Sequence, residues 1–255
     1  MAPEAESAAA FAFLAHVERA YAGLLETAAA NAETGLGGKL FYAGELDAEG
    51  RALVVAANIA GAASLAAIAD RDIQKQAVRD GIADFLVTSL DEALRILKNQ
   101  LRKREAVAVC VALAPEAVEC EMRDRGVLPD LQRRDVEKRQ SGTIRNADRA
   151  VLQWTVASAQ AQWLPKLDAI AMECLNENAW RERRWLRLAP RYLGRLAQRI
   201  RLMRCDDPSA TRFVQQVQQL VARREIAVAV EMKVRDAAGQ EEEWRMRPPE
   251  EMSIQ

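Results

Sequence analysis

The stretch "LDEALRILKNQLRKREAVAVCVALAPEAVECEMRDRG", residues 90–126, contains the pattern that decides the fold. Ser89 stands immediately before it and Glu92 follows three residues later, which is the spacing of a helix capping box. The nine residues "AVAVCVALA" are almost uninterrupted small and branched apolar residues, as in a strand that is buried on both faces of a parallel sheet. Pro115 then suits a helix start and Gly126 a helix end. The stretch therefore predicts a helix, a buried strand and a second helix.

The same alternation of strand and helix runs through the rest of the first 131 residues. Working outward, the apolar spacing and the glycine breaks predict helices over residues 5–31, 50–58 and 70–81, and strands over 39–44, 64–69 and 127–131. Residues 82–88 predict a strand or a connecting turn. Alternating strands and helices are typical of a doubly wound parallel sheet with helices on both faces. We expect an α/β domain of this kind.

The sequence changes in character after this point. Residues 132–146 are polar and charged and predict a linker or an exposed loop. Apolar residues at helical spacing predict helix over 147–176. The later part of the arginine-rich segment 180–204 predicts an amphipathic helix that groups Arg191, Arg195 and Arg199 on one face. Residues 209–224 predict a further helix, and residues 226–246 a β-hairpin that turns at Gly239. The expected domains are residues 1–135 and a mainly helical, basic unit over 136–255.

Composition limits the functional classes. Half of the 255 residues are apolar and 29% are charged, as in ordinary globular proteins, and no apolar run reaches the length of a membrane span. Residues 1–130 hold 13 Lys and Arg against 20 Asp and Glu, whereas residues 131–255 hold 23 against 17. The four cysteines form no CxxC pair, which favours reduced thiols in a cytoplasmic protein without a metal site.

The residues of the first half resemble the Rossmann-like domain of urocanase, the urocanate hydratase of histidine breakdown. The resemblance covers about Thr27 to Leu131 and rests on the "LDEAL" helix at Leu90, the buried strand that follows, and "RGVLPD" at residues 125–130. It also includes the upstream stretch "GGKLFYAGELDAEGRALVVAANIAG". The resemblance implies a Rossmann-like fold that binds NAD tightly, with NAD acting as an electrophile on the imidazole of urocanate.

Several motifs of that family are missing from this sequence. Where urocanases have the glycine-rich loop G-L-G-G-M-G-G-A-Q, this chain has ELDAEGRAL at residues 45–53, so only Gly50 remains of five glycines. Ile68 replaces the first residue of the acidic pair that the resemblance places on a ribose, and only Asp70 remains. Leu113-Ala114-Pro115 replace G-N-A, and "QRRDVEKR" replaces D-Q-T-S-A-H-D-P. The catalytic segment with its cysteine has no counterpart.

Gly50, Arg51 and Asp70 are the candidate cofactor-binding residues, because they are placed to reach the phosphates and ribose of NAD. A pyrophosphate needs free backbone amides and close approach of the main chain, while Glu45, Asp47 and Glu49 make the loop negative. We therefore expect this part of the chain to keep its strand–loop–helix geometry without a tight pyrophosphate site. His16, the only histidine, and Cys110 are interpreted as structural residues. We assign no catalytic residue.

Three functional hypotheses follow. The first is a urocanase-related protein with a degenerate NAD-binding domain, which is not an active hydratase and acts by binding a protein partner, a second copy of itself or a small anion. The second is an NAD-dependent lyase similar to urocanate hydratase that a second chain completes. The third is binding of nucleic acid or a membrane surface by the arginine-rich helix, where we expect the arginines instead to pair with the acidic first half or a second subunit.

Overall fold

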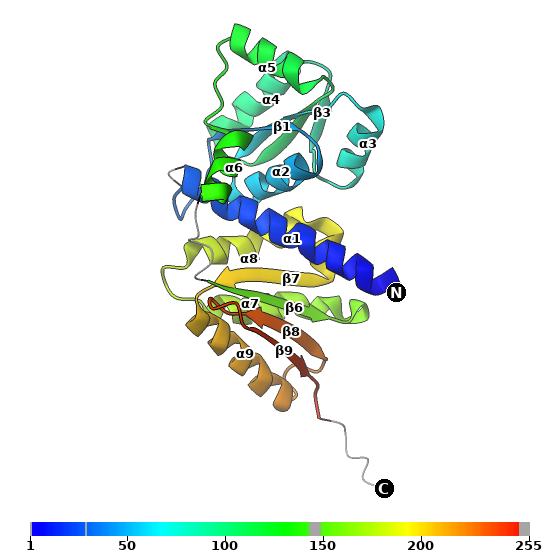
Figure 1. The fold of residues 1–255 in the computed structure, drawn as a ribbon, viewed down its shortest axis with the longest axis vertical. Coiled ribbons are helices and arrows are strands. Elements are labelled where there is room, and N and C mark those ends of the chain that lie inside the picture. The colour runs from blue at the N-terminus through cyan, green and yellow to red at the C-terminus, as the bar shows by residue number, and fades with distance from the viewer. Residues whose placement is uncertain (1, 29, 143–148, 250–255) are drawn as a thin grey trace. The chain divides into compact units, whose positions relative to one another are not determined.

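The structure is a computed structural model that describes residues 2–28, 30–142 and 149–249 (Figure 1). The chain divides into two compact units, residues 1–143 and 144–255. Each unit has its own sheet. We describe the two units separately.

The first unit is built on a five-stranded parallel sheet. Its strands are β1 (Leu40–Glu45), β2 (Ala63–Ala67), β3 (Phe85–Val87), β4 (Val107–Val111) and β5 (Leu131–Gln132). They lie in the order β3-β4-β2-β1-β5, and every neighbouring pair is parallel. All residues of β2 and β4 are buried, which accounts for the uninterrupted apolar run at β4.

Helices follow the strands in alternation. They are α1 (Ala2–Thr27), α2 (Ala48–Ala60), α3 (Arg71–Arg79), α4 (Leu90–Lys103), α5 (Pro115–Asp124) and α6 (Arg133–Gly142). Apolar side chains of α4 and α5 form one core with alternate residues of β1, β2 and β4, among them Leu65 and Val109. The intervening strand residues, such as Phe41 and Ala66, are also buried and face the opposite side, towards α2. α1 packs against α2 and α6 (Figure 1).

Two details of this unit refine the sequence analysis. The capping box is present in part: Ser89 Oγ accepts the Glu92 main-chain N–H at 3.3 Å, whereas Glu92 Oε2 accepts from the N–H of Thr88, one residue before the N-cap, at 3.1 Å. The prediction of a linker or exposed loop over residues 132–146 was wrong for residues 133–142, which form α6. Val136 is completely buried there, and the buried contact with α1 gives this polar segment its helical form. Residues 143–148 lie outside the described residues.

The second unit contains a four-stranded antiparallel sheet and helices. Its elements are β6 (Ala150–Val156), η2 (Ser158–Trp163), α7 (Leu164–Cys174), α8 (Trp180–Tyr192), η3 (Gly194–Gln198), β7 (Ile200–Cys205), α9 (Asp207–Ala222), β8 (Val230–Arg235) and β9 (Glu241–Met246). The strand order is β7-β6-β8-β9. The predicted hairpin is β8 and β9, which pair antiparallel.

Two predicted helical segments of this unit are strands. Residues 150–156 form β6, in the middle of the sheet, and residues 200–205 form β7, where the amphipathic helix was expected to continue. α8 ends at Tyr192, so Arg195 and Arg199 do not lie on it. The predicted fold class is nevertheless confirmed: a Rossmann-like parallel sheet with flanking helices precedes helices and a C-terminal antiparallel sheet.

Candidate functional site

The candidate site lies at the carboxyl ends of β1 and β5, which are neighbours in the sheet. From β1 the chain crosses to β2 on one side, whereas β5 joins β1 on the other side. Open α/β sheets bind their ligands at such a reversal of strand order, outside the carboxyl ends of the strands. Helix α2 begins directly after β1, so its first turn faces this position.

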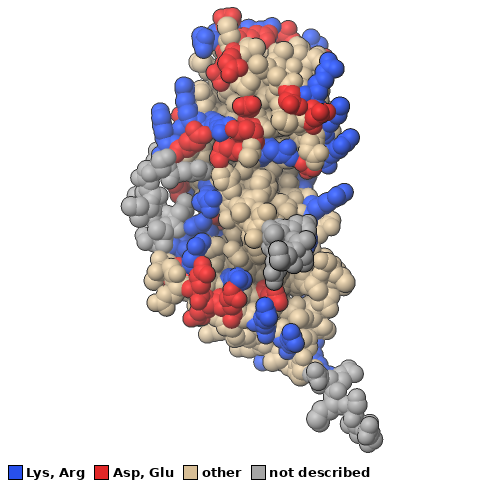
Figure 2. Space-filling view, turned by 45° about the vertical axis from the view of Figure 1, so that its right-hand side comes forward, with Lys and Arg blue, Asp and Glu red and all other residues tan. Residues whose placement is uncertain are grey.

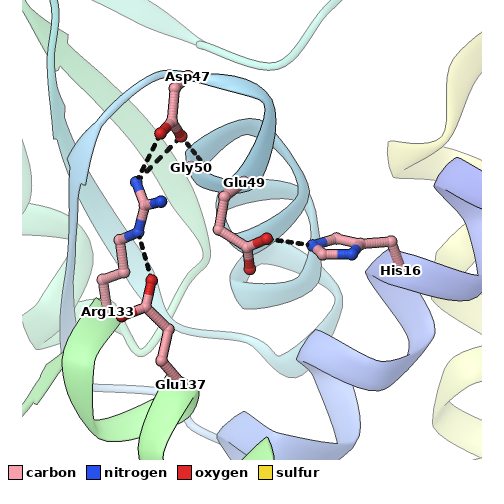
Figure 3. Close-up of polar contacts among 6 residues, drawn as sticks. All are labelled: His16, Asp47, Glu49, Gly50, Arg133 and Glu137. Atoms are coloured by element: carbon pink, nitrogen blue, oxygen red, sulfur yellow. Dashed lines mark hydrogen bonds and ion pairs between the residues drawn. The ribbon is translucent and has the colours of Figure 1, made fainter.

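Asp47 occupies the N-terminus of α2 (Figure 3). It is the N-cap residue, and its Oδ1 accepts a hydrogen bond of 2.7 Å from the Gly50 main-chain N–H. In nucleotide-binding domains the amides at this position meet a phosphate. Here a carboxylate of the chain itself accepts from one of them. An N-cap aspartate before an apolar helical run is a known sequence signature, and the sequence analysis missed it.

Gly50 is required by the packing of α2 on β1. A Cβ atom built on Gly50 would lie 2.0 Å from the Glu45 carbonyl oxygen, a separation that no real Cβ tolerates. Glycine therefore permits close approach of the helix to the strand, which is the role of the last glycine in the dinucleotide-binding fingerprint. The one family glycine that this chain retains has a structural function in the described contacts.

Arg133, the first residue of α6, holds the Asp47 carboxylate from the other side (Figure 3). Its Nη1 donates to both carboxylate oxygens of Asp47, at 3.0 and 3.1 Å, and its Nε donates to Glu137 Oε1 at 2.7 Å. Burial opposes the charge on Arg133, but the hydrogen bonds to Glu137 and Asp47 outweigh it and raise the pKa of the guanidinium. The pair Asp47–Arg133 thus joins the β1–α2 loop to α6.

His16 adds a second link to the same loop. Its Nε2 lies 2.6 Å from Glu49 Oε2, and both side chains are about half-buried between α1 and α2 (Figure 3). Residues 16 and 49 are far apart in the sequence, and no pattern in the sequence indicates their contact. The contact agrees with the structural role that we expected for His16.

The predicted cofactor-binding residues Arg51 and Asp70 each have partners within the chain. Arg51 forms an ion pair with Asp80, which follows α3. Asp70 caps α3, and its Oδ1 accepts from the main-chain N–H groups of Asp72 at 2.8 Å and Ile73 at 3.1 Å. Within the described residues, no side-chain hydrogen bond or ion pair joins Asp70 to Gly50 or Arg51, which are neighbours in α2. Their role in binding NAD stays a prediction.

A groove of about 520 Å³ opens at the carboxyl ends of β1 and β5. Its apolar wall comes from β1, α5 and the segment before β5, and its rim is charged; the lining includes Tyr42, Met122, Val127, Leu128, Arg123 and Arg134. Leu128 is 86% exposed. Tyr42 donates a hydrogen bond of 3.4 Å to the Pro115 carbonyl, and burial together with the nearby Glu119 raises its pKa. The sequence analysis did not find this groove.

The other candidate residues have structural surroundings. Burial raises the pKa of the Cys110 thiol to about 12, which suits the core residue that we expected and not a nucleophile. Among the described residues, no group of three or more His, Cys, Asp and Glu side chains is arranged to hold a metal ion. None of the helices in the described ranges is both long and apolar enough to cross a membrane.

Several arginines of the arginine-rich segment, residues 180–204, form hydrogen bonds within the second unit. Arg183 on α8 donates to the main-chain oxygens of Met172, Leu175 and Asn176, each at 2.9 Å. Arg201 on β7 is buried and donates to Asp168. On the face shown in Figure 2, basic and acidic side chains are interspersed. The packing predicted for Arg191, Arg195 and Arg199 against an acidic surface or second subunit stays a prediction.

The first unit is a Rossmann-like α/β domain. Its parallel strands alternate with helices, and the strand order reverses at β1 and β5, where such sheets bind their ligands. Comparison with protein families gives a more specific result. Residues 17–135 match the family model described as the urocanase Rossmann-like domain. Residues 17–135 are therefore similar to the urocanase Rossmann-like domain, and the resemblance predicted for residues 27–131 is confirmed.

Proposed function

We propose that this protein is a urocanase-related binding protein whose NAD-binding domain is degenerate. It is not an active hydratase, and it acts by binding a protein partner or a small anion. The observation that carries the proposal is the position of the Asp47 carboxylate at the N-terminus of α2.

The electrostatics of the loop support this proposal. Asp47 accepts the Gly50 N–H and is paired with Arg133, so the donors nearest to a phosphate already serve a carboxylate. A pyrophosphate would have to displace that carboxylate and would meet Glu45, which is exposed beside it. The negative charges of these carboxylates repel the pyrophosphate and so oppose its binding, most strongly where water is excluded.

The groove beside β5 is the proposed binding surface. Its charged lining is mixed, with three arginines and three glutamates (Arg123, Arg133, Arg134, Glu45, Glu119 and Glu137). Arg123 and Arg134 are exposed, so a small anion would bind at these two cations, with its apolar part on the apolar wall. Val127, Leu128 and Pro129 form an apolar segment in the same lining, and an exposed apolar segment of this kind is also typical of a protein contact. A small anion and a protein partner would both bind at the carboxyl end of the sheet. Neither would need to displace Asp47 from the N-terminus of α2.

A cytoplasmic location belongs to the same proposal. All four cysteines are free thiols, and Cys110, Cys174 and Cys205 are buried, as is common in a reducing compartment. A connection with histidine catabolism rests on the urocanase domain alone.

A direct assay tests the absence of hydratase activity. We expect purified full-length protein, supplied with NAD and urocanate, to leave the ultraviolet absorbance of urocanate unchanged relative to a control without enzyme. An active urocanate hydratase in the same buffer serves as the positive control. A loss of absorbance that scales with the concentration of this protein would refute the proposal.

A further inference from the structure

The second unit contains a groove between α9 and the β8–β9 hairpin. Its volume is about 390 Å³. α9 contributes Ala210 and Val214 to its apolar floor, and the hairpin contributes Val234 and Trp244. The groove lies in the second unit, so it is separate from the site described above.

The groove exists because α9 does not cover the outer strand of the sheet. Trp154, Met232 and Trp244 are register partners across β6, β8 and β9, so they lie in one row on one face. The rings of Trp154 and Phe213 of α9 are 5.0 Å apart, and Trp154 and Met232 are fully buried. Trp244, at the end of the row on the outer strand β9, is only half-buried. An apolar wall is therefore left open.

The charge of this groove has one sign. Asp207, Asp236 and Glu242 line it, and its lining contains no lysine or arginine. Glu242 pairs in register with Val234, so it lies on the same face of β9 as Trp244, two residues away. Asp236 accepts from the Gln240 N–H at 2.7 Å and Asp207 from the Ala237 N–H at 3.3 Å. The side chain of Glu242 has no hydrogen-bond or ion-pair partner among the described residues.

We propose that this groove docks a segment of a partner protein that presents a lysine or arginine side chain. The apolar stem of that side chain lies against Trp244, Val234 and Val214, and its charged end pairs with Glu242. Charge complementarity selects the occupant, because three carboxylates without a cation attract a basic segment and repel an acidic one. The long stems of lysine and arginine suit an apolar floor with a charged rim.

The hairpin offers a matched pair of variants for the test. Glu242→Gln removes the charge that faces the groove. Glu243→Gln removes the same charge from the neighbouring residue, which lies on the opposite face of β9 and pairs with Lys233. Both side chains are exposed, so neither variant should disturb the core. Thermal unfolding monitored by tryptophan fluorescence checks that both variants stay folded.

The probe is a capped, fluorescein-labelled hexapeptide that alternates leucine and lysine, titrated with full-length protein and followed by fluorescence anisotropy. We expect saturable binding that weakens as NaCl rises from about 0.05 to about 0.5 M. Glu242→Gln should weaken it about fivefold or more, whereas Glu243→Gln should change it less than about twofold. A peptide with glutamine in place of lysine should not bind.

Several results would overturn the proposal. One is the absence of saturable binding up to about 1 mM protein, and another is equal weakening by the two variants, which would indicate attraction by net charge alone. Displacement of the peptide by an equal concentration of spermidine would show a site for small amines and not for a partner segment. Self-association of Glu242→Gln on a sizing column, without peptide binding by the original protein, would mean that Glu242 only protects an outer strand.

Discussion

Gly50 lies where the first turn of α2 passes closest to β1, and its lack of a side chain determines how the loop is built. In an ordinary helix interior, alanine is more favourable than glycine by roughly 0.5–1 kcal/mol. At this position a methyl group would overlap the Glu45 carbonyl oxygen at 2.0 Å. The steric cost should therefore outweigh the gain in helix propensity.

We expect Gly50→Ala to destabilise the first unit by at least about 2 kcal/mol, because the helix must move away from the strand. Gly81→Ala is the control: no atom lies within 4 Å of its Cβ position, but φ is +68°, so it should cost only about 1–2 kcal/mol. Far-ultraviolet circular dichroism follows the unfolding. Gly50→Ala should lower the midpoint of the circular-dichroism transition more than Gly81→Ala does. Equal stability of Gly50→Ala and the original protein would contradict this account.

The residue scale also shows where sequence reasoning reached its limit. The position of Gly50 at the start of α2 followed from the sequence, because a glycine and a helix pattern occur together there. The partners of Arg51 and Asp47 did not follow, because Asp80 and Arg133 are 29 and 86 residues away in the sequence. Only the fold brings such side chains together.

At the scale of elements, the sequence predicted β4 correctly but not β6 and β7, although all three strands are largely buried. β4 reads as a continuous apolar run and was found, whereas β6 and β7 were predicted as helix. In β6 most residues are buried, so the alternation that marks a half-exposed strand is absent, and its apolar residues also fit a helical period. Its pairing with β7 and β8 determines its conformation.

Tertiary contacts also determine where one charged residue of β7 lies, as the buried pair Asp168–Arg201 shows. Arg201 reads as a surface residue in the sequence, yet it is 7% exposed and its Nε donates to both Asp168 oxygens, at 2.8 and 3.0 Å. Burial raises the pKa of Asp168 to about 6 although Arg201 opposes this shift. Desolvation therefore outweighs the attraction, and the pair joins α7 to β7 without large net stabilisation.

We expect Asp168→Leu to lower the free energy of unfolding of the second unit by about 3–5 kcal/mol, because it leaves a buried arginine that cannot lose its charge. Arg201→Met should cost less, because a buried carboxyl can take up a proton. The double variant should cost less than Asp168→Leu alone. Urea unfolding followed by tryptophan fluorescence measures all three. A double variant whose loss equals the sum of the single losses would contradict the account.

At the scale of the whole molecule, the fold of the first unit was predicted more accurately from the sequence than the fold of the second. The strand–helix alternation and the "LDEAL … RGVLPD" frame predicted the Rossmann-like unit, and the family match covers residues 17–135. The structure divides the chain between residues 143 and 144, beyond α6, because Val136 anchors this polar helix on α1. The open groove beside β5 could not be predicted, since it depends on how α5 and the following segment leave the sheet.

For the whole first unit, we propose that the Rossmann-like domain keeps the strand–loop–helix geometry of a nucleotide site while its own Asp47 takes the place of a phosphate. Asp47→Ser is a matched variant, because serine also caps helices but carries no charge. It should bind NAD several times more tightly than the original protein, since it removes the carboxylate and frees the Nη1 of Arg133.

The most direct test is isothermal titration calorimetry of NAD into the purified full-length protein, together with release of nucleotide from freshly purified protein on denaturation. The account predicts no bound NAD and a dissociation constant of about 1 mM or weaker, which corresponds to about −4 kcal/mol. A dissociation constant in the low micromolar range, or NAD released from the fresh protein, would contradict it.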